Sequence, residues 1–297
     1  MKNIAFIINP ISGTQNKRKL SKLIPSLLDK DQWLENIVYT EYAGHATELA
    51  RSFAVMGFDA VVAVGGDGTV NEVARGIRDT DTALGIIPMG SGNGFARHLG
   101  IPLRVNAAIE MLNHCEPLRA DYGLANERMF VCTCGTGFDA LIADHFAVAG
   151  KRGFGTYVEK IVQDLLRYKP LNYHIVSTDP KEGVDITTNA FLITFANANQ
   201  WGNAAYIAPK ASIQDGKMDI CIMSNHAVFG AAGLAIGLFT KMIDKSLFMD
   251  TLRAKDILLE REEAAPFHLD GDPVEMPKDI HIRIVEDGLR VLAAKRY

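Results

Sequence analysis

Short apolar runs alternate with helix-like segments through the first 120 residues of the chain. The runs predict strands at 3–10, 36–42, 58–66 and 83–90, and the segments that follow them predict helices at 16–30, 45–56, 70–79 and 94–100. The run at 58–66 is continuous and rich in valine, which is typical of a strand buried on both faces. Alternation of this kind predicts a parallel sheet with helices on both of its faces.

From about residue 121 the pattern changes to short strand-like runs bounded by Gly, Pro, Asp and Asn. Many of these runs alternate apolar and polar positions, which predicts antiparallel strands with one face in a core. Helices are expected to interrupt them at 141–169 and 226–246. The expected fold class is therefore an N-terminal parallel α/β domain followed by a C-terminal antiparallel β-sandwich domain. The runs lie at 128–135, 172–178, 190–198, 217–224, 256–262, 266–274, 279–287 and 289–294.

Composition and charge narrow the classes of function. The chain has 297 residues, of which 48% are hydrophobic and 22% are charged, as in ordinary globular proteins of two domains. A net charge of −4 provides no basic field, so we expect no nucleic-acid partner. Four scattered cysteines argue against a disulfide framework.

Two apolar segments bear on membrane contact. The stretch before Asn9-Pro10 is short and lacks a cleavage site, so we do not expect a secretory signal. The segment at 227–239 is apolar but shorter than the roughly 20 residues that span a bilayer. A buried helix and a helix lying on a membrane both fit it. We expect a cytoplasmic protein with transient contact to a membrane surface.

Each predicted strand of the N-terminal domain ends in a turn of small and polar residues. These turns occupy 9–13, Thr40 with 44–47, 65–72 and 88–94. Carboxyl ends of parallel strands meet at one edge of a sheet, which is where ligands bind in such folds. One glycine-rich turn alone would fit an ordinary strand-to-helix connection. Four such turns at equivalent positions indicate a ligand site.

The composition of these turns fits phosphate. Gly65, Gly66 and Gly68 leave the main chain accessible, and N–H groups at a helix start form a cradle for anions. A carboxylate at Asp67 would repel phosphate unless a cation lies between them, which indicates Mg²⁺. No GxxxxGK[ST] pattern occurs, so the site is not a P-loop. Short polar side chains that add hydrogen bonds are Thr69, Asn71, Ser12, Thr40 and Ser91.

A set of motifs follows in order along the chain: NPISG at 9–13, GGDGTVNE at 65–72, PMGSGNGFAR at 88–97, RADYG at 119–123, GTGFDA at 135–140, DGKMD at 215–219 and LDGD at 269–272. The set resembles the diacylglycerol kinase catalytic-domain family, which includes bacterial diacylglycerol kinases and YegS-type lipid kinases, with sphingosine and ceramide kinases as relatives. The resemblance runs almost end to end. It implies a nucleotide-binding domain of the phosphofructokinase and NAD kinase type at 1–121 plus about 284–297, and a β-rich lipid-substrate domain at 122–283.

The resemblance implies an ATP- and Mg²⁺-dependent lipid kinase of phospholipid metabolism. The acceptor would be a hydroxyl of a diacylglycerol, a sphingoid base or a related long-chain lipid. Glu72 would steady the glycine loop or reach the nucleotide. The residues implied to hold ATP are Asn9, Ser12, Gly13, Thr40, Gly65, Gly66, Asp67, Gly68, Thr69, Val70, Asn71, Glu72 and Ser91.

The resemblance also implies two places for magnesium. Asp67 and Asp121 would organise the ion at the nucleotide through water molecules. A separate structural ion would bind the Asp215 carboxylate, with main-chain carbonyls near Ser212 and Lys217 completing the site. A plain hairpin turn at 215–216 is the alternative, and both readings can hold together.

Two departures from the family pattern concern catalysis. Asp272 would be the general base, at a position where the family usually carries glutamate, and Asp67 is the alternative base. The shorter aspartate can still accept a proton, since geometry decides before pKa. Gly94 stands where bacterial diacylglycerol kinases usually carry an aspartate of the metal network. The GSGN form resembles sphingosine kinases, which tilts the expected acceptor toward a long-chain amino alcohol.

Other functions stay open at this point. NAD kinases share the GGDG motif, so a kinase of a soluble substrate is one alternative. The departures at Asp272 and Gly94 make a catalytically inactive nucleotide sensor the other. Phe138 and Asp139 would border the lipid head group or simply close a strand-to-helix turn. Exposed strand edges in β-rich domains often pair, so a homodimer is also open.

Overall fold

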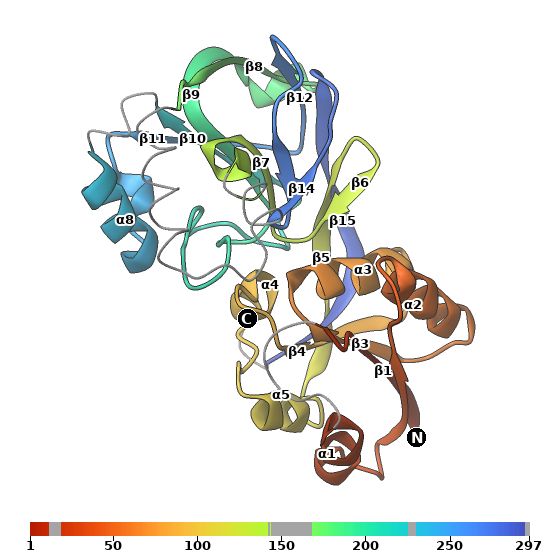
Figure 1. Ribbon diagram of the computed structural model, residues 1–297. Coiled ribbons are helices and arrows are strands. Elements are labelled where there is room, and N and C mark those ends of the chain that lie inside the picture. Colours follow the sequence, from red (N-terminus) through yellow and green to blue (C-terminus); the bar gives the residue numbers. More distant parts are fainter. Residues whose placement is uncertain (12–18, 142, 144–167, 225–229, 295–297) are drawn as a thin grey trace. The chain divides into compact units, whose positions relative to one another are not determined.

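The computed structural model describes residues 1–11, 19–141, 143, 168–224 and 230–294 (Figure 1). The chain divides into two compact units, unit 1 with Met1–Tyr122 and Glu286–Tyr297, and unit 2 with Gly123–Val285. Strands β5 (Glu116–Ala125) and β15 (Ile280–Ala293) each contribute residues to both units. The predicted fold class, a parallel α/β part and an antiparallel β-sandwich, is confirmed.

Unit 1 is built on a parallel sheet in the order β2-β1-β3-β4, and the end of β15 pairs with β4 in the same direction. All residues of β3 (Ala60–Gly65) and β4 (Ala83–Pro88) are buried, as the continuous apolar run predicted. Strand β1 spans Lys2–Ile8. Strand β2 spans Trp33–Tyr39 and begins earlier than predicted, because Trp33 is buried and pairs with Lys2.

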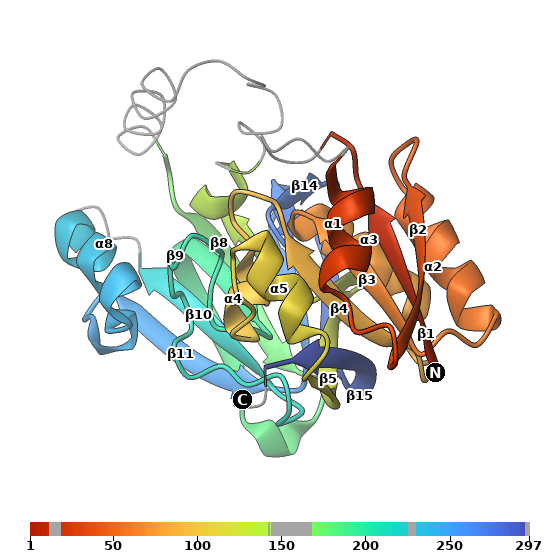
Figure 2. The same ribbon diagram turned by 90° about the horizontal axis from the view of Figure 1, so that it is seen from below.

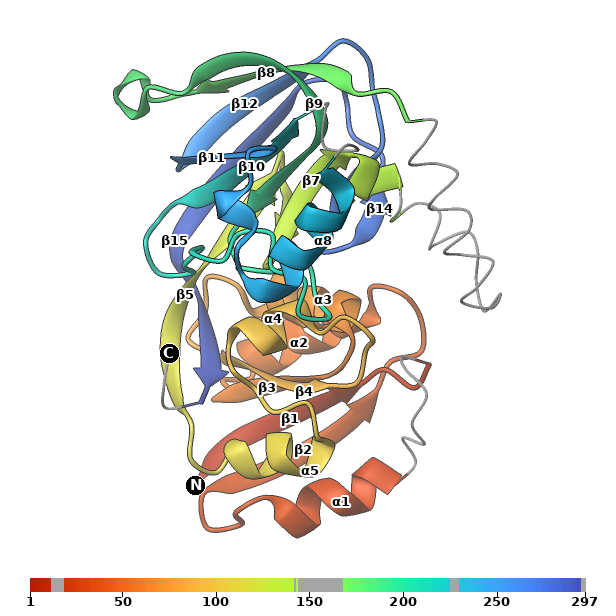
Figure 3. The same cartoon turned by 90° about the vertical axis from the view of Figure 1, so that its left-hand side faces the viewer.

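Helices lie on both faces of this sheet. Helices α1 (Leu20–Leu27) and α5 (Val105–Met111) lie on one face, and α2 (His45–Val55) and α3 (Asp67–Ile77) lie on the other (Figure 3). The short α4 (Gly94–His98) follows β4, and α5 had no counterpart among the predicted elements. Helix α3 begins at Asp67 and not at residue 70, because Gly66 is the last extended residue. The polar residues after β3 therefore form the first turns of a helix.

Unit 2 is an antiparallel β-sandwich. Strands β7 (Thr133–Gly137), β9 (Asp185–Ala196), β8 (Leu171–Ser177), β12 (Asp256–Arg261) and the first half of β15 pair in that order. Strands β10 (Met218–Ser224) and β11 (Met249–Ala254) extend from β9, and the hairpin of β13 (Phe267–Leu269) and β14 (Asp272–Val274) extends from β7. Strand β6 (Arg128–Phe130) pairs with β5, and a 3-10 turn, η2 (Pro180–Glu182), precedes β9.

Two apolar clusters fill unit 2. Along β10, Ile220 and Ile222 belong to one cluster, and Cys221 and Met223 belong to the other, as the period of two in a strand requires. Helix α8 (Ala231–Thr240) and the 3-10 turn η4 (Ile243–Lys245) cover the second cluster. A helix within the predicted segment 226–246 is thus confirmed. The predicted helix at 141–169 lies almost entirely outside the described residues.

Candidate functional site

The register of the parallel sheet brings the predicted polar turns together. Ile8 pairs with both Tyr39 and Val64, and Gly65 pairs with Pro88, so the four strands end at one edge. Asn9, Thr40, the start of α3 and the turn after β4 therefore lie next to one another. Ser12 and Gly13 lie outside the described residues.

The turns after β3 and β4 approach so closely that glycine is required. A Cβ atom added at Gly90 would lie 2.6 Å from the Cα atom of Gly66, and one added at Gly65 would lie 2.4 Å from Thr69 Oγ1. The Met89 N–H donates to the Gly65 carbonyl at 2.7 Å, which ties the two turns together. The first N–H groups of a helix have no partner inside it, so the start of α3 offers donors to an anion.

Asp67 connects these two turns. Its Oδ1 accepts the Gly94 N–H at 2.7 Å and its Oδ2 accepts the Asn93 N–H at 2.8 Å. Both carboxylate oxygens thus hold the start of α4. Asp67 therefore lies at the edge where the glycine turns meet, which is where its predicted role toward the waters of a magnesium ion places it.

Asn93 shapes the turn after β4 and was not among the predicted site residues. Its backbone is left-handed, with φ of 50°, a conformation that asparagine adopts more readily than most residues. Its side chain accepts the Gly90 N–H at 2.9 Å and donates to the Gly90 carbonyl at 2.8 Å. The signal was present in the sequence, as an asparagine between two glycines in GSGNG.

Glu72 steadies the start of α2. Its Oε1 accepts the Gly44 N–H at 3.0 Å and its Oε2 accepts the Ala46 N–H at 3.1 Å. The Thr47 hydroxyl donates to the Glu72 carbonyl at 2.9 Å. Of the two roles implied for Glu72, this geometry corresponds to steadying the loops.

The remaining residues that were predicted to bind the nucleotide differ in their hydrogen bonds and in the exposure of their side chains. Asn9 donates through Nδ2 to Thr69 Oγ1 at 3.2 Å, and its own N–H donates to the Val64 carbonyl at 3.1 Å. The Val70 side chain is buried in the core, and the Val70 N–H donates to the Gly66 carbonyl at 3.1 Å. Thr40 is also buried, whereas Ser91 is exposed and Asn71 is partly exposed.

Asp121 supports a different turn of unit 1. It lies on β5, is fully buried, and accepts the Asp287 N–H through Oδ1 at 2.9 Å. Asp287 has a left-handed backbone, with φ of 54°, within β15. The Asp121 carboxylate thereby holds the backbone of β15 at this position.

In unit 2, the predicted base sits on a tightly built hairpin. Asp270 and Gly271 form its two-residue turn, with φ of 51° and 87°. The Asp270 carboxylate accepts three main-chain N–H groups, from Val131 at 2.9 Å, Cys132 at 2.7 Å and Thr133 at 3.1 Å. Asp272, the first residue of β14, is exposed. The hydrogen bonds of Asp270, which are partly buried, therefore fix the backbone that presents Asp272.

A buried polar network lies behind this hairpin. His268 accepts the Gly271 N–H through Nδ1 at 3.3 Å, so its Nε2 carries the proton that it donates to Asp139 Oδ2 at 3.1 Å. The Thr194 hydroxyl donates to the same oxygen at 3.0 Å. Phe138 packs on Phe191 with ring centroids 4.7 Å apart. Phe138 and Asp139 therefore make their contacts inside unit 2. His268 was not among the site residues predicted from the sequence.

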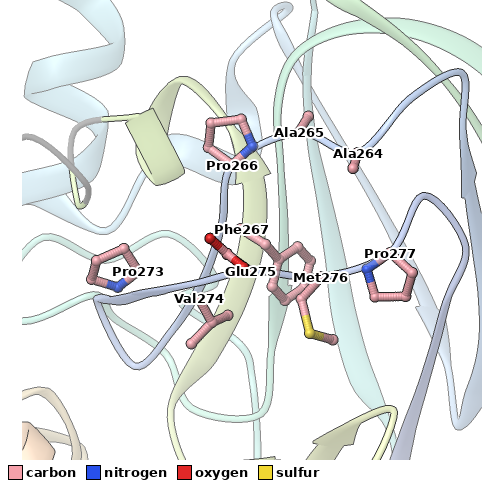
Figure 4. A pocket seen from close by; sticks show the side chains of 9 residues that line it. All are labelled: Ala264, Ala265, Pro266, Phe267, Pro273, Val274, Glu275, Met276 and Pro277. Atoms are coloured by element: carbon pink, nitrogen blue, oxygen red, sulfur yellow. The ribbon is translucent and has the colours of Figure 1, made fainter.

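A cavity of about 650 Å³ adjoins the same hairpin (Figure 4). Prolines and apolar side chains form most of its lining, and Glu275 is the acidic member. Arg261 holds the main chain at two of the lining residues. Its guanidinium donates to the carbonyls of Ala265 at 2.9 Å and Met276 at 3.3 Å. Burial lowers the pKa of Arg261. The lining residues are Ala264, Ala265, Pro266, Phe267, Pro273, Val274, Glu275, Met276 and Pro277.

The predicted structural magnesium site contains a cationic side chain. The Arg253 guanidinium contacts the Asp215 carboxylate through Nη2, and its Nε lies 3.2 Å from Asp219 Oδ1. Asp219 is buried, which raises its pKa to about 6. The Lys217 N–H donates to Asp215 at 3.2 Å, and the Gln214 N–H donates to the Ser212 hydroxyl at 3.2 Å. Because a guanidinium already compensates Asp215, this arrangement does not fit a magnesium ion there.

The residues that the structure describes contain neither a metal cluster nor a membrane-spanning helix. Within them, no three or more His, Cys, Asp and Glu side chains gather in a way that could hold a metal ion. No described helix combines the length and apolar character needed to cross a membrane.

Two protein families match consecutive parts of the chain. Residues 3–125 match the family described as "Diacylglycerol kinase catalytic domain", and residues 132–293 match "YegS C-terminal NAD kinase beta sandwich-like domain". A Bacillus subtilis protein named "Diacylglycerol kinase" is 31% identical over 75% of this chain and 74% of its own length. A Chromohalobacter salexigens protein named "Probable lipid kinase YegS-like" is 30% identical over 77% of this chain and 75% of its own length.

The solved structures agree on the fold. The structure of a diacylglycerol kinase from Bacillus anthracis superposes with a TM-score of 0.73 and covers 99% of this chain and 97% of its own. Its sequence is 20% identical, so this likeness describes the fold alone.

Proposed function

Because the chain belongs to the diacylglycerol kinase family of lipid kinases, we propose that it transfers the γ-phosphoryl group of ATP to a lipid hydroxyl. The acceptor class is a diacylglycerol, a sphingoid base or a related long-chain lipid. The observation that carries the proposal is the edge of the unit 1 sheet, where glycine turns and the start of α3 meet. This edge has the donors and the close main-chain approach that phosphates need.

Unit 1 would bind and orient the nucleotide. The N–H groups at the start of α3 would donate hydrogen bonds to the phosphates. Asn9 and Thr69 would line the same edge through their hydrogen-bonded pair at 3.2 Å. Magnesium bound with ATP would neutralise phosphate charge and orient the transferred group. Asp67 would hold that ion through waters, while it continues to brace α4.

Unit 2 would supply the base and the acceptor surface. Asp272 is exposed on a hairpin whose backbone is fixed by Asp270, and its carboxylate would take the proton of a lipid hydroxyl. The neighbouring cavity of about 650 Å³, with its prolines, Phe267 and Met276, offers apolar surface to part of a lipid. Apolar surface beside an exposed carboxylate would suit a long-chain alcohol.

Radiolabelled ATP incubated with a total lipid extract and, separately, with NAD tests the proposal. We expect labelled lipid with the wild-type protein and a fall in rate of about 10²- to 10⁴-fold for Asp272→Asn. ATP affinity should be unchanged in this variant, and Asp272→Glu should keep most of the activity. Identifying the labelled lipid then names the acceptor.

Three results would overturn parts of this function. Labelled NAD without labelled lipid would make the protein a kinase of a soluble substrate. ATP binding without turnover on any lipid pool would make it a nucleotide sensor. Full activity of Asp272→Ala would move the base to another residue, with Asp67 as the first candidate.

A further inference from the structure

The exposed apolar side chains of unit 2 are concentrated in one short segment. In the described part of unit 2, every exposed large apolar side chain lies between Ile236 and Leu247. Their exposed fractions are 64% for Ile236, 62% for Phe239, 51% for Met242 and 99% for Leu247. We call these four side chains the α8 patch. Single exposed apolar residues are ordinary, but a concentration of this kind marks an interaction site.

The exposure of the α8 patch cannot be relieved by rotating the helix. The opposite side of the segment is already used, because Leu234 and Ile243 are buried in the second core cluster beneath it. The Tyr206 N–H donates to the Leu238 carbonyl at 2.8 Å, and the Met242 N–H donates to the Gly237 carbonyl at 2.9 Å. The fold therefore holds both sides of an apolar helix in place, one inward and one toward solvent.

The position of α8 is that of a helix with one side buried and the other exposed. The helix lies beside β10 and β11 in both views (Figures 1 and 2). The Phe248 ring packs against Gly230, because a Cβ atom added at Gly230 would lie 2.3 Å from that ring. The two ends of the segment from Gly230 to Phe248 therefore contact each other.

Three lysines and two aspartates lie at or near the α8 patch, although the whole chain has a net charge of −4. Lys241 and Lys245 are exposed beside it. Asp244 is largely covered, and Lys210 Nζ lies 2.7 Å from its Oδ2. Asp250 on β11 is the exposed acid that follows the segment.

We propose that the α8 patch docks on the surface of a membrane that contains anionic lipids. Ile236, Phe239, Met242 and Leu247 would enter the headgroup boundary, and Lys241 and Lys245 would meet lipid phosphates. A second copy of the chain would place lysines against lysines, so it suits the patch less well. Helix α8 has 10 residues and would lie on the membrane, not cross it. The inference deepens the proposed function, since a lipid acceptor resides in such a membrane.

Vesicle binding tests the surface without using kinase activity. Vesicles of phosphatidylcholine with roughly 30% phosphatidylglycerol should sediment the wild-type protein, and vesicles of phosphatidylcholine alone should sediment much less of it. The variant Ile236→Gln/Phe239→Gln/Leu247→Gln should lose about tenfold or more of the partition coefficient. Lys241→Gln/Lys245→Gln should lose the preference for anionic vesicles.

A matched control removes exposed apolar side chains elsewhere. Leu34, Val55 and Met56 of unit 1 are also exposed, and replacing them with glutamine should leave vesicle binding unchanged. Wild-type binding by the α8 triple variant would overturn the proposal. So would conversion of a wild-type dimer into a monomer by the triple variant, because a second copy would then be the occupant.

Kinase assays separate this inference from the proposed function. With a short-chain acceptor dispersed in water, the α8 triple variant should phosphorylate as fast as wild type, and with the same lipid class in vesicles it should be slower. If wild type phosphorylates no lipid but binds anionic vesicles through the α8 patch, the proposed function fails and the docking surface stands. If wild type phosphorylates lipid but the triple variant is unaffected on vesicles, the docking surface fails alone.

Discussion

Asp67 holds the first residue of α4, because its Oδ1 accepts the Gly94 N–H at 2.7 Å. Its Oδ2 accepts the neighbouring Asn93 N–H at 2.8 Å. The aspartate of the glycine loop therefore joins the turn after β3 to the turn after β4. A structural task of this kind explains why a carboxylate stands among groups suited to phosphate.

Asp67→Asn should weaken both the fold and nucleotide binding. The amide NH₂ would face one of the two N–H donors, so we expect a loss of about 1–3 kcal/mol in the free energy of unfolding. The affinity for ATP should fall as well, because the two turns are no longer held together. Urea denaturation and calorimetric ATP titration measure the two effects. An unchanged stability and ATP affinity with a lost catalytic rate would instead identify Asp67 as the general base.

The close approach of Gly66 and Gly90 gives a second prediction. In Gly90→Ala, the new Cβ would lie 2.6 Å from main-chain atoms of Gly66, so the turns must separate. We expect a loss of about 1–3 kcal/mol in stability and weaker ATP binding. Gly233→Ala in α8 is the control, since a Cβ there meets nothing within 4 Å. That variant should be neutral or more stable by up to about 1 kcal/mol, and equal effects of both substitutions would contradict the steric argument.

The parallel sheet and the meeting of its polar turns could be predicted, because they depend on local patterns. The buried strand β3 and the glycines after it are contiguous in sequence. The partners of the carboxylates could not be predicted in the same way. Asp67 and Gly94 are 27 positions apart, and Asp270 accepts N–H groups about 138 positions away, so only the folded topology brings them together. The start of α3 was placed too late because glycines obscure helical propensity, although Gly66 ends the strand.

Substitutions at Asp270 and at Asp272 should have different effects, the first on stability and the second on catalysis. Asp270→Ala removes the acceptor of three main-chain N–H groups and the residue that suits φ of 51°, so we expect a loss of roughly 3 kcal/mol. Asp272→Asn should leave the denaturation midpoint unchanged, because Asp272 is exposed. Comparing urea midpoints of the two variants checks this. A larger loss of stability for Asp272→Asn than for Asp270→Ala would refute the assignment of Asp270 as the structural member.

We predict that Arg253, and not a divalent ion, neutralises the Asp215 carboxylate. The wild-type melting temperature should not respond to EDTA or to Mg²⁺ in the absence of nucleotide, because the guanidinium already contacts Asp215 and Asp219. Arg253→Met leaves these carboxylates without their cation, and we expect a loss of about 1–3 kcal/mol that Mg²⁺ partly restores. Arg283→Met is the control, since it breaks a surface pair with Glu127 at 3.8 Å. A wild-type protein destabilised by EDTA would restore the magnesium site implied by the family resemblance.

His174 should make stability depend on pH. Its Nε2 lies 2.8 Å from Asp185 Oδ1 and its Nδ1 lies 2.6 Å from Glu260 Oε2, and these hydrogen bonds raise the pKa of His174. A pKa raised on folding stabilises the protein fully below the unfolded value of about 6.5, and this contribution is lost as the pH rises through the folded value. The urea midpoint should therefore fall as the pH rises above about 6.5. The fall should be smaller at high salt, because the side chains are partly exposed. His174→Gln should reduce the dependence of the urea midpoint on pH. The control is His114→Gln, which changes an exposed histidine and should leave that dependence unchanged. An unchanged dependence in His174→Gln would show that other groups cause it.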